Sequence, residues 1–155
     1  MSTMTEGAAE APAARRVDQL LAHYADSHLN PKNALIHCAA VPLIMVSLVG
    51  LMYALHPWVA YAFLAASMVY YVRLGSWIFL ATMAVTSALS IVIVQSLGSW
   101  LLPVSVAVFV LAWIAQFVGH KIEGKKPSFF EDLQYLWVGP LFVLAKLFGK
   151  LGVRY

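Results

Sequence analysis

Two long stretches without a charged side chain constrain this chain more than any other feature of its sequence. Residues 33–72 and 74–120 contain no Asp, Glu, Lys or Arg, and Arg73 alone separates them. A helix needs roughly 20 apolar residues to cross a bilayer, so each stretch is long enough for two crossings and a turn. The composition agrees, because 62% of the 155 residues are hydrophobic and only 11% are charged. The sequence therefore predicts a protein embedded in a membrane.

Each uncharged stretch contains one break that is typical of a turn. Leu55-His56-Pro57 interrupts the first stretch, and Gln-Ser-Leu-Gly-Ser at 95–99 interrupts the second. The second of the resulting helices is short for a full crossing, so we expect it to tilt or to thin the bilayer locally. The predicted fold is an all-α polytopic membrane four-helix bundle, with spans near residues 34–55, 58–72, 76–97 and 100–120.

The positive charges predict how this bundle is oriented. Short cytoplasmic flanks of membrane proteins collect Lys and Arg. Four spans with both termini inside place all ten Lys and Arg residues on the cytoplasmic side and leave both outer turns without any. Residues 129–148 are also apolar, but a fifth span there would leave Lys146, Lys150 and Arg154 outside. We therefore expect a C-terminal re-entrant or interfacial helix near 129–148.

The N-terminal region and the overall charge complete this picture. Apolar residues over 15–28 recur at spacings of three and four, which predicts an amphipathic helix before the first span. Residues 1–14 are small and polar, so we expect a disordered tail followed by one membrane domain over 15–155. Basic flanks that face anionic membrane lipid explain the net charge of +3, and we find no nucleic-acid-binding motif. A bundle of this size is compatible with a homodimer.

Three histidines are expected to meet at the cytoplasmic surface. His28 lies on the apolar stripe of the amphipathic helix, and His37 lies two turns into the first span. In one continuous helix they would be roughly 13 Å apart. Asn30-Pro31 predicts a cap and a new helix start between them, which allows the two imidazoles to approach. His120 ends the fourth span, so the predicted topology brings it to the same surface.

Further polar residues accompany these histidines. Asn33 precedes His37 by one helical turn, Gln116 precedes His120 by one turn, and Glu123 follows three residues later. Ionisable side chains in or beside membrane spans are costly and therefore mark functional sites. Imidazoles and a carboxylate without a thiolate suit Fe(II), Mn or Zn. The sequence predicts a metal site formed by His28, His37, His120 and Glu123, supported by Asn33 and Gln116.

Other interpretations of these residues stay open at this point. A histidine near a span end is commonly an interfacial residue, and Asn33 and Gln116 equally fit hydrogen bonds between helices. Glu123 also fits a solvated charged turn. The whole chain is compatible with a haem-binding electron carrier that uses His37 and His120 as axial ligands. It is also compatible with a non-catalytic scaffold or transporter, although the polar residues cluster at one membrane face, which favours an enzyme.

Two blocks of the sequence resemble a known family. The segments "YADSHLNPKNALIHCAAVP" (24–42) and "QFVGHKIEGKKPSFFEDLQYLWVGPLFVL" (116–144) are similar to the signature blocks of small membrane proteins related to the yeast 2-hydroxy fatty acid dioxygenase of phytosphingosine breakdown. The resemblance implies an Fe(II)-dependent dioxygenase of fatty acid α-oxidation. Such an enzyme converts a long-chain 2-hydroxy fatty acid and O2 to the acid one carbon shorter and CO2. By motif position, His28, His37 and His120 inherit the role of iron ligands.

The same resemblance suggests where the protein and its substrate lie. The segment "GHKIEGKKPSF" is similar to bacterial members, which implies an integral protein of the bacterial inner membrane with its metal site on the cytoplasmic side. We expect Lys121, Lys125 or Lys126 to steer the substrate carboxylate at this rim. We expect the acyl tail to lie between spans, among residues such as Leu43, Phe109 and Phe117.

Overall fold

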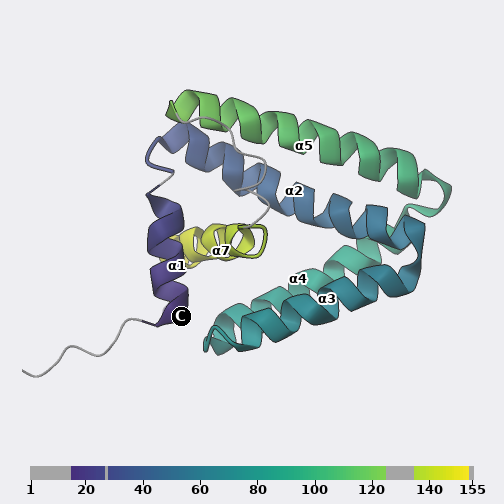
Figure 1. Cartoon of the computed structure of the whole chain (residues 1–155), viewed down its shortest axis with the longest axis horizontal. Helices are drawn as coiled ribbons and strands as arrows, with labels where there is room; N and C mark the ends of the chain where they lie inside the picture. The colour runs from purple at the N-terminus through teal and green to yellow at the C-terminus, as the bar shows by residue number, and fades with distance from the viewer. Residues whose placement is uncertain (1–14, 27, 125–134, 154–155) are drawn as a thin grey trace, which may run out of the picture.

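The described part of the chain, residues 15–26, 28–124 and 135–153 of a computed structural model, consists of helices joined by short turns (Figure 1). The prediction of an all-α fold is confirmed. The expected tail over 1–14 and the first residues of the expected segment 129–148 lie outside the described residues. The helices are α1 (Arg16–Ala25), α2 (Pro31–Leu55), α3 (Pro57–Val72), α4 (Trp77–Ser96), the short 3-10 turn η1 (Gly98–Trp100), α5 (Leu101–Glu123) and α7 (Val138–Leu151).

Local sequence signals explain where the helices begin and end. The Asn30 side chain accepts a hydrogen bond from the backbone N–H of Lys32 at 2.9 Å, and Pro31 follows as the first residue of α2. His56 ends α2 and caps α3, because its Nδ1 accepts the backbone N–H of Trp58 at 3.3 Å. Gly124 ends α5 in the left-handed conformation, with φ of 77°.

Three segments are long and apolar enough to cross a membrane: α2, α4 and the run from η1 through α5. The helix α3 has only 16 residues, so it is the shortest of the four expected spans, as the sequence indicated. Large apolar side chains cover the outer faces, and Leu55 and Trp77 are about 80% exposed. Such exposure suits contact with lipid rather than water.

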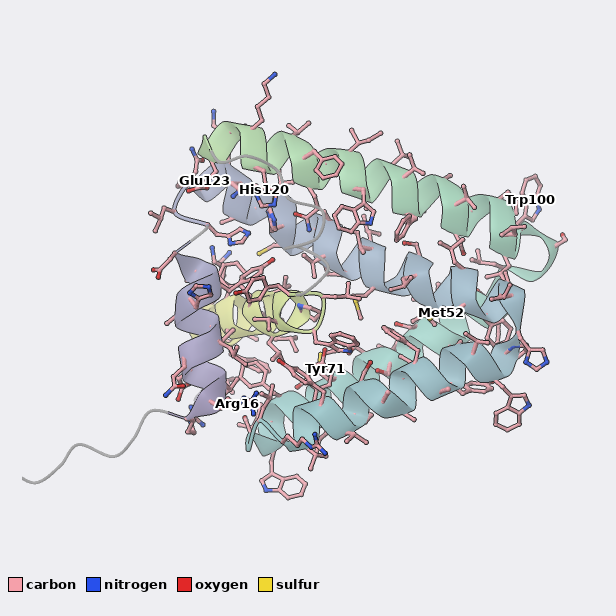
Figure 2. The ribbon with its side chains drawn as sticks, in the orientation of Figure 1. Arg16, Met52, Tyr71, Trp100, His120 and Glu123 are labelled. Carbon is pink, nitrogen blue, oxygen red and sulfur yellow. The ribbon has the colours of Figure 1, made fainter. Side chains whose placement is uncertain are left out.

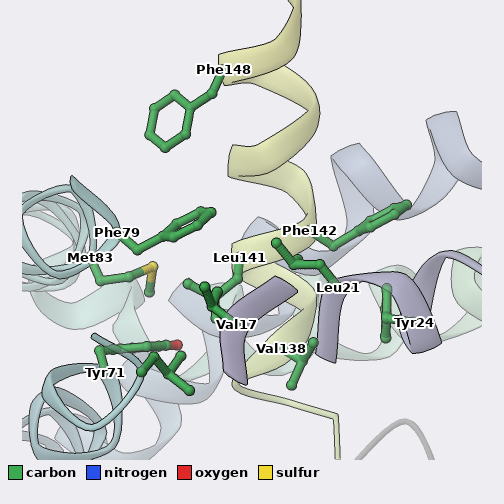
Figure 3. Packing of buried hydrophobic residues seen from close by; sticks show 11 residues of the cluster. Val17, Leu21, Tyr24, Tyr71, Phe79, Met83, Val138, Leu141, Phe142 and Phe148 are labelled. Carbon is green, nitrogen blue, oxygen red and sulfur yellow. The ribbon is translucent and has the colours of Figure 1, made fainter. Parts of the chain in front are cut away.

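The helices form two pairs that diverge from a common end (Figure 1). The pair α2–α5 and the pair α3–α4 meet at the turns that follow α2 and α4, and they separate toward the opposite end. The helices α7 and α1 pack at that open end. Their apolar side chains join those of α3 and α4 in one cluster, in which Val17, Leu141 and Phe79 are fully buried (Figure 3).

Small residues hold the α2–α5 pair together. They recur every seven positions, as Asn33, Ala40 and Ser47 on α2 and Ser105, Ala112 and Gly119 on α5, and all are buried. A Cβ added to Gly119 would collide with Asn33 Oδ1, so a larger residue would require Asn33 or the helices to shift. Small side chains let membrane helices pack closely without a hydrophobic driving force. This seam places the start of α2 directly beside the end of α5.

Candidate metal centre

Three imidazoles meet where α2 begins and α5 ends. Figure 2 shows one of them, His120, close to Glu123 at this end of the molecule. The ring centroids of His28 and His37 are 4.1 Å apart, those of His37 and His120 are 5.1 Å apart, and those of His28 and His120 are 6.2 Å apart. The exposed fractions of the three side chains are 6%, 0% and 7%. The break between α1 and α2 at Asn30 makes this possible, because it turns His28 back toward His37. The structure therefore brings together all three histidines that the sequence singled out.

The backbone fixes which nitrogen of two of these rings carries a proton. His28 Nδ1 lies 2.8 Å from the carbonyl oxygen of Tyr24, and His37 Nδ1 lies 3.1 Å from that of Asn33. A carbonyl oxygen only accepts, so each Nδ1 must donate a hydrogen. In the neutral ring the lone pair then resides on Nε2. Histidines that bind metals characteristically donate their other ring N–H to a carbonyl or carboxylate in this way.

Imidazole nitrogens are suitable ligands for a divalent metal, and the tautomer of His28 and His37 leaves the lone pair on Nε2. The described side chains nevertheless do not form a complete coordination shell in this arrangement. Within the described residues, no group of three or more His, Cys, Asp or Glu side chains is arranged to hold an ion. His28 and His37 meet edge to face, with their planes 76° apart. Rotation of the rings has to bring their Nε2 atoms toward one point before all three can bind the same ion.

Glu123 has partners other than those expected of a metal ligand. Its carboxylate accepts hydrogen bonds from the backbone N–H groups of Leu29 at 2.9 Å and Asn30 at 3.0 Å, and from Asn33 Nδ2 at 2.9 Å. The first backbone N–H groups of a helix lack intrahelical partners and favour a negative charge. Glu123 therefore connects the end of α5 to the start of α2. In this arrangement it positions the helices that carry His37 and His120.

Asn33 and Gln116 occupy different surroundings. Asn33 is fully buried, and it contacts both Glu123 through its amide and His37 through its backbone carbonyl. Gln116 is 4% exposed, and its Oε1 has no hydrogen-bond partner among the described residues. It lines a cavity of about 20 Å³ together with Tyr24 and Trp113. That volume is sufficient for about one water molecule, which could satisfy the amide oxygen.

Two residues that the sequence reasoning did not assign to the site lie beside His28, and a third, Lys146, lies against one of them. The Tyr24 ring stacks on the His28 ring, with centroids 4.4 Å apart and planes at 19°. The Phe142 ring is 5.3 Å from the same imidazole, and Lys146 Nζ lies 4.9 Å from the Phe142 centroid. The spacing of four residues between Tyr24 and His28 could have revealed the first. The other two come from α7, whose position no local pattern indicates.

The lysines expected to steer the substrate are only partly placed. Lys121 is exposed, directly after His120 on α5. Lys125 and Lys126 lie outside the described residues. Lys146 is therefore a basic side chain that the structure adds to this end of the molecule.

Comparison with known proteins connects this site to an enzyme family. The family model described as "2-hydroxy-palmitic acid dioxygenase Mpo1-like" matches residues 14–151, which include every described helix. The chain belongs to the Mpo1-like family. The resemblance inferred from the two sequence blocks is confirmed.

A curated relative supports the same assignment. This Mpo1-like chain is 28% identical over 138 residues to the 2-hydroxy-palmitic acid dioxygenase MPO1 of Saccharomyces cerevisiae, and the alignment covers 85% of the chain and 79% of the relative. No solved structure matches the chain. The comparisons thus support a membrane protein related to a lipid-metabolising dioxygenase.

Proposed function

We propose that this Mpo1-like protein is an Fe(II)-dependent dioxygenase of fatty acid α-oxidation. It converts a long-chain 2-hydroxy fatty acid and O2 to the acid one carbon shorter, CO2 and water. The observation that carries the proposal is the convergence of three buried imidazoles, whose ring centroids are 4.1 to 6.2 Å apart. His28 comes from the turn between α1 and α2, His37 from α2 and His120 from α5. The name of the yeast relative supports the substrate class.

In this proposal His28, His37 and His120 hold the iron. Bound Fe(II) supplies a redox centre for O2 and a template for the hydroxy acid, a chemistry that suits histidine ligands with open positions. The carbonyls of Tyr24 and Asn33 keep the Nδ1 protons in place, so Nε2 of His28 and His37 carries the lone pair that would bind the metal.

The surrounding side chains exclude water and orient the substrate. Tyr24 and Phe142 cover the His28 ring on two sides, which lowers the local dielectric and strengthens charge interactions in the site. Lys146 and Lys121 provide positive charge near the rim and attract the carboxylate. We propose that these contacts orient the C1–C2 bond, which breaks during the reaction.

We also propose that the site lies on the cytoplasmic side of the membrane. Arg73 occupies the turn between α3 and α4, and Figure 1 shows this turn at the same end of the molecule as the start of α2 and the end of α5. Basic residues therefore gather at the end that carries the histidines, and the turns at the opposite end, residues 56 and 97–100, carry none. This distribution supports cytoplasmic exposure of the histidine end.

Oxygen consumption by detergent-purified protein tests the activity. The protein is loaded with Fe(II) without oxygen and then given long-chain acids of equal length with and without a 2-hydroxyl group. We expect O2 uptake that requires both iron and the 2-hydroxyl, and a product one carbon shorter by mass spectrometry. Folded, iron-loaded protein that consumes no O2 with any of these acids would contradict the proposal, and a Soret band would favour the haem carrier instead.

A further inference from the structure

An apolar cavity of about 230 Å³ lies between α2, α4 and α7. Apart from the hydroxyls of Thr86, Ser87 and Ser90, the side chains that line it are hydrophobic, and no charged residue among those described contributes to it. The other lining residues are Pro42, Met45, Val46, Val49, Leu64, Met83, Leu89, Ile93, Pro140, Val143 and Leu144. Such a lining suits an uncharged hydrocarbon ligand.

The cavity lies deeper along α2 than the histidines. Pro42, at its near end, is five residues after His37, or about 7 Å along the helix axis, and the lining continues to Val49 over about 10 Å more. The helix α7 borders both sites. Phe142 packs against His28, whereas the next residue, Val143, lines the cavity. A polar site near the start of a span is thus followed by an apolar site near its middle, which is the order of groups in a fatty acid.

The cavity opens sideways toward the lipid. Its floor is buried, since Val49, Met83 and Ser90 are 1%, 6% and 8% exposed. On its rim, Leu89 and Ile93 of α4 are 55% and 46% exposed. A hydrocarbon chain dissolved in the bilayer could therefore enter between α2 and α4 without passing through water.

We propose that this cavity binds the acyl tail of the 2-hydroxy fatty acid while its carboxylate lies at the histidines. The inference rests on the proposed function and names the part of the protein that selects chain length. An apolar cavity of 150 Å³ can hold benzene, so 230 Å³ accommodates roughly eight to ten carbons. The location differs from the one expected from sequence, because Leu43 and Phe117 are 49% and 37% exposed and do not line the cavity.

Photolabelling of the full-length protein in lipid nanodiscs tests the location directly. The probe is 2-hydroxypalmitic acid with a diazirine in the middle of its chain, and labelled residues are identified by mass spectrometry. We expect adducts on Met45, Val46, Ser90 or Val143, and we expect excess unlabelled 2-hydroxypalmitic acid to compete. Adducts confined to the outer face of α5, or cavity labelling that palmitic acid without the hydroxyl displaces equally well, would overturn the proposal.

A matched pair of variants tests the role in chain-length selection. Ser90→Phe fills the floor of the cavity, whereas Ala88→Phe adds the same ring on an exposed position of the same helix. We expect Ser90→Phe to shift the preferred substrate toward shorter chains, with at least a tenfold fall in kcat/KM for the 16-carbon acid, and Ala88→Phe to have no such effect. Met45→Ala, which enlarges the cavity and should fold, is expected to shift the preference toward longer chains. Unchanged preference in folded Ser90→Phe and Met45→Ala proteins would overturn the proposal.

The two proposals can fail separately, because labelling requires neither iron nor turnover. Cavity labelling in a protein that consumes no O2 would contradict the dioxygenase and leave the tail site standing. Turnover of 2-hydroxy acids by a protein labelled elsewhere would support the dioxygenase and overturn the tail site.

Discussion

Two hydroxyls on α4 and the Asn33–Glu123 pair on α2 and α5 are satisfied in different ways. On α4, the hydroxyls of Thr82 and Ser90 donate to carbonyl oxygens four residues earlier in the same helix, at 2.8 Å each. On the α2–α5 pair, Asn33 and Glu123 bond to each other across 90 residues of sequence at 2.9 Å. His28 and His37 follow the first pattern, because the Nδ1 of each donates to the carbonyl oxygen four residues earlier.

This difference distinguishes polar side chains that bond within one helix from polar side chains that hold two helices in a fixed relative position. A hydroxyl that bonds to its own helix is satisfied before the helices assemble, so it fixes no neighbour. Bonds between α2 and α5 fix the relative position of two helix ends, and that position determines where His37 and His120 meet. We conclude that α2–α5 positions the histidines, whereas α4 lines the apolar cavity. Three predictions test this contrast.

Loss of one imidazole should have the largest effect. His37→Ala removes a proposed ligand whose side chain is fully buried, so we expect a fall in kcat/KM of at least 100-fold and loss of bound iron. Iron content and O2 uptake measure both. His56→Ala is the control on the other pair, because this exposed histidine only caps α3. Wild-type iron content and turnover in His37→Ala would remove this residue from the ligand set.

Adding a methyl group between α2 and α5 should have an intermediate effect. Gly119→Ala places a methyl group against Asn33, so we expect a decrease of about 1–3 kcal/mol in the free energy of unfolding in mixed micelles. Gly149→Ala is the matched control, because this helical glycine has no atom within 4 Å of the added Cβ. Its stability should stay equal or rise by up to about 1 kcal/mol. Equal stability of the two variants would contradict the tight seam.

Weakening the connection between α5 and α2 should have the smallest effect of the three. Glu123→Gln removes the negative charge and turns an amide toward N–H donors, so we expect the free energy of unfolding to fall by about 1–2 kcal/mol. The three histidines are unchanged in this variant, and we expect KM to increase. Thr82→Val removes a bond within α4 and should change stability by less than about 0.5 kcal/mol. Thermal unfolding of both variants measures the contrast, and a larger loss in Thr82→Val would reverse it.

Much of the fold could be predicted because it depends on local signals. The uncharged stretches, the Asn30-Pro31 cap and the break at His56-Pro57 specify where helices lie, since lipid forces each segment to satisfy its own backbone. The three histidines could be predicted because topology and a turn bring them to one surface. The partners of Glu123 could not, because a carboxylate near a helix end fits a metal, a solvated turn or an N-terminus equally well. The contacts of Phe142 and Lys146 depend on where α7 docks.

A helical membrane protein with three imidazoles at one surface could be inferred from the residues alone. These features follow from hydrophobicity, charge and helical period, which act over a few residues or along one span. Three features depend instead on how the helices pack: Glu123 binds the start of α2, α7 supplies Phe142 and Lys146, and an apolar cavity opens between α2 and α4. Between helices in lipid, close packing rather than hydrophobicity selects the partners, and packing depends on the shapes of surfaces that are distant in sequence.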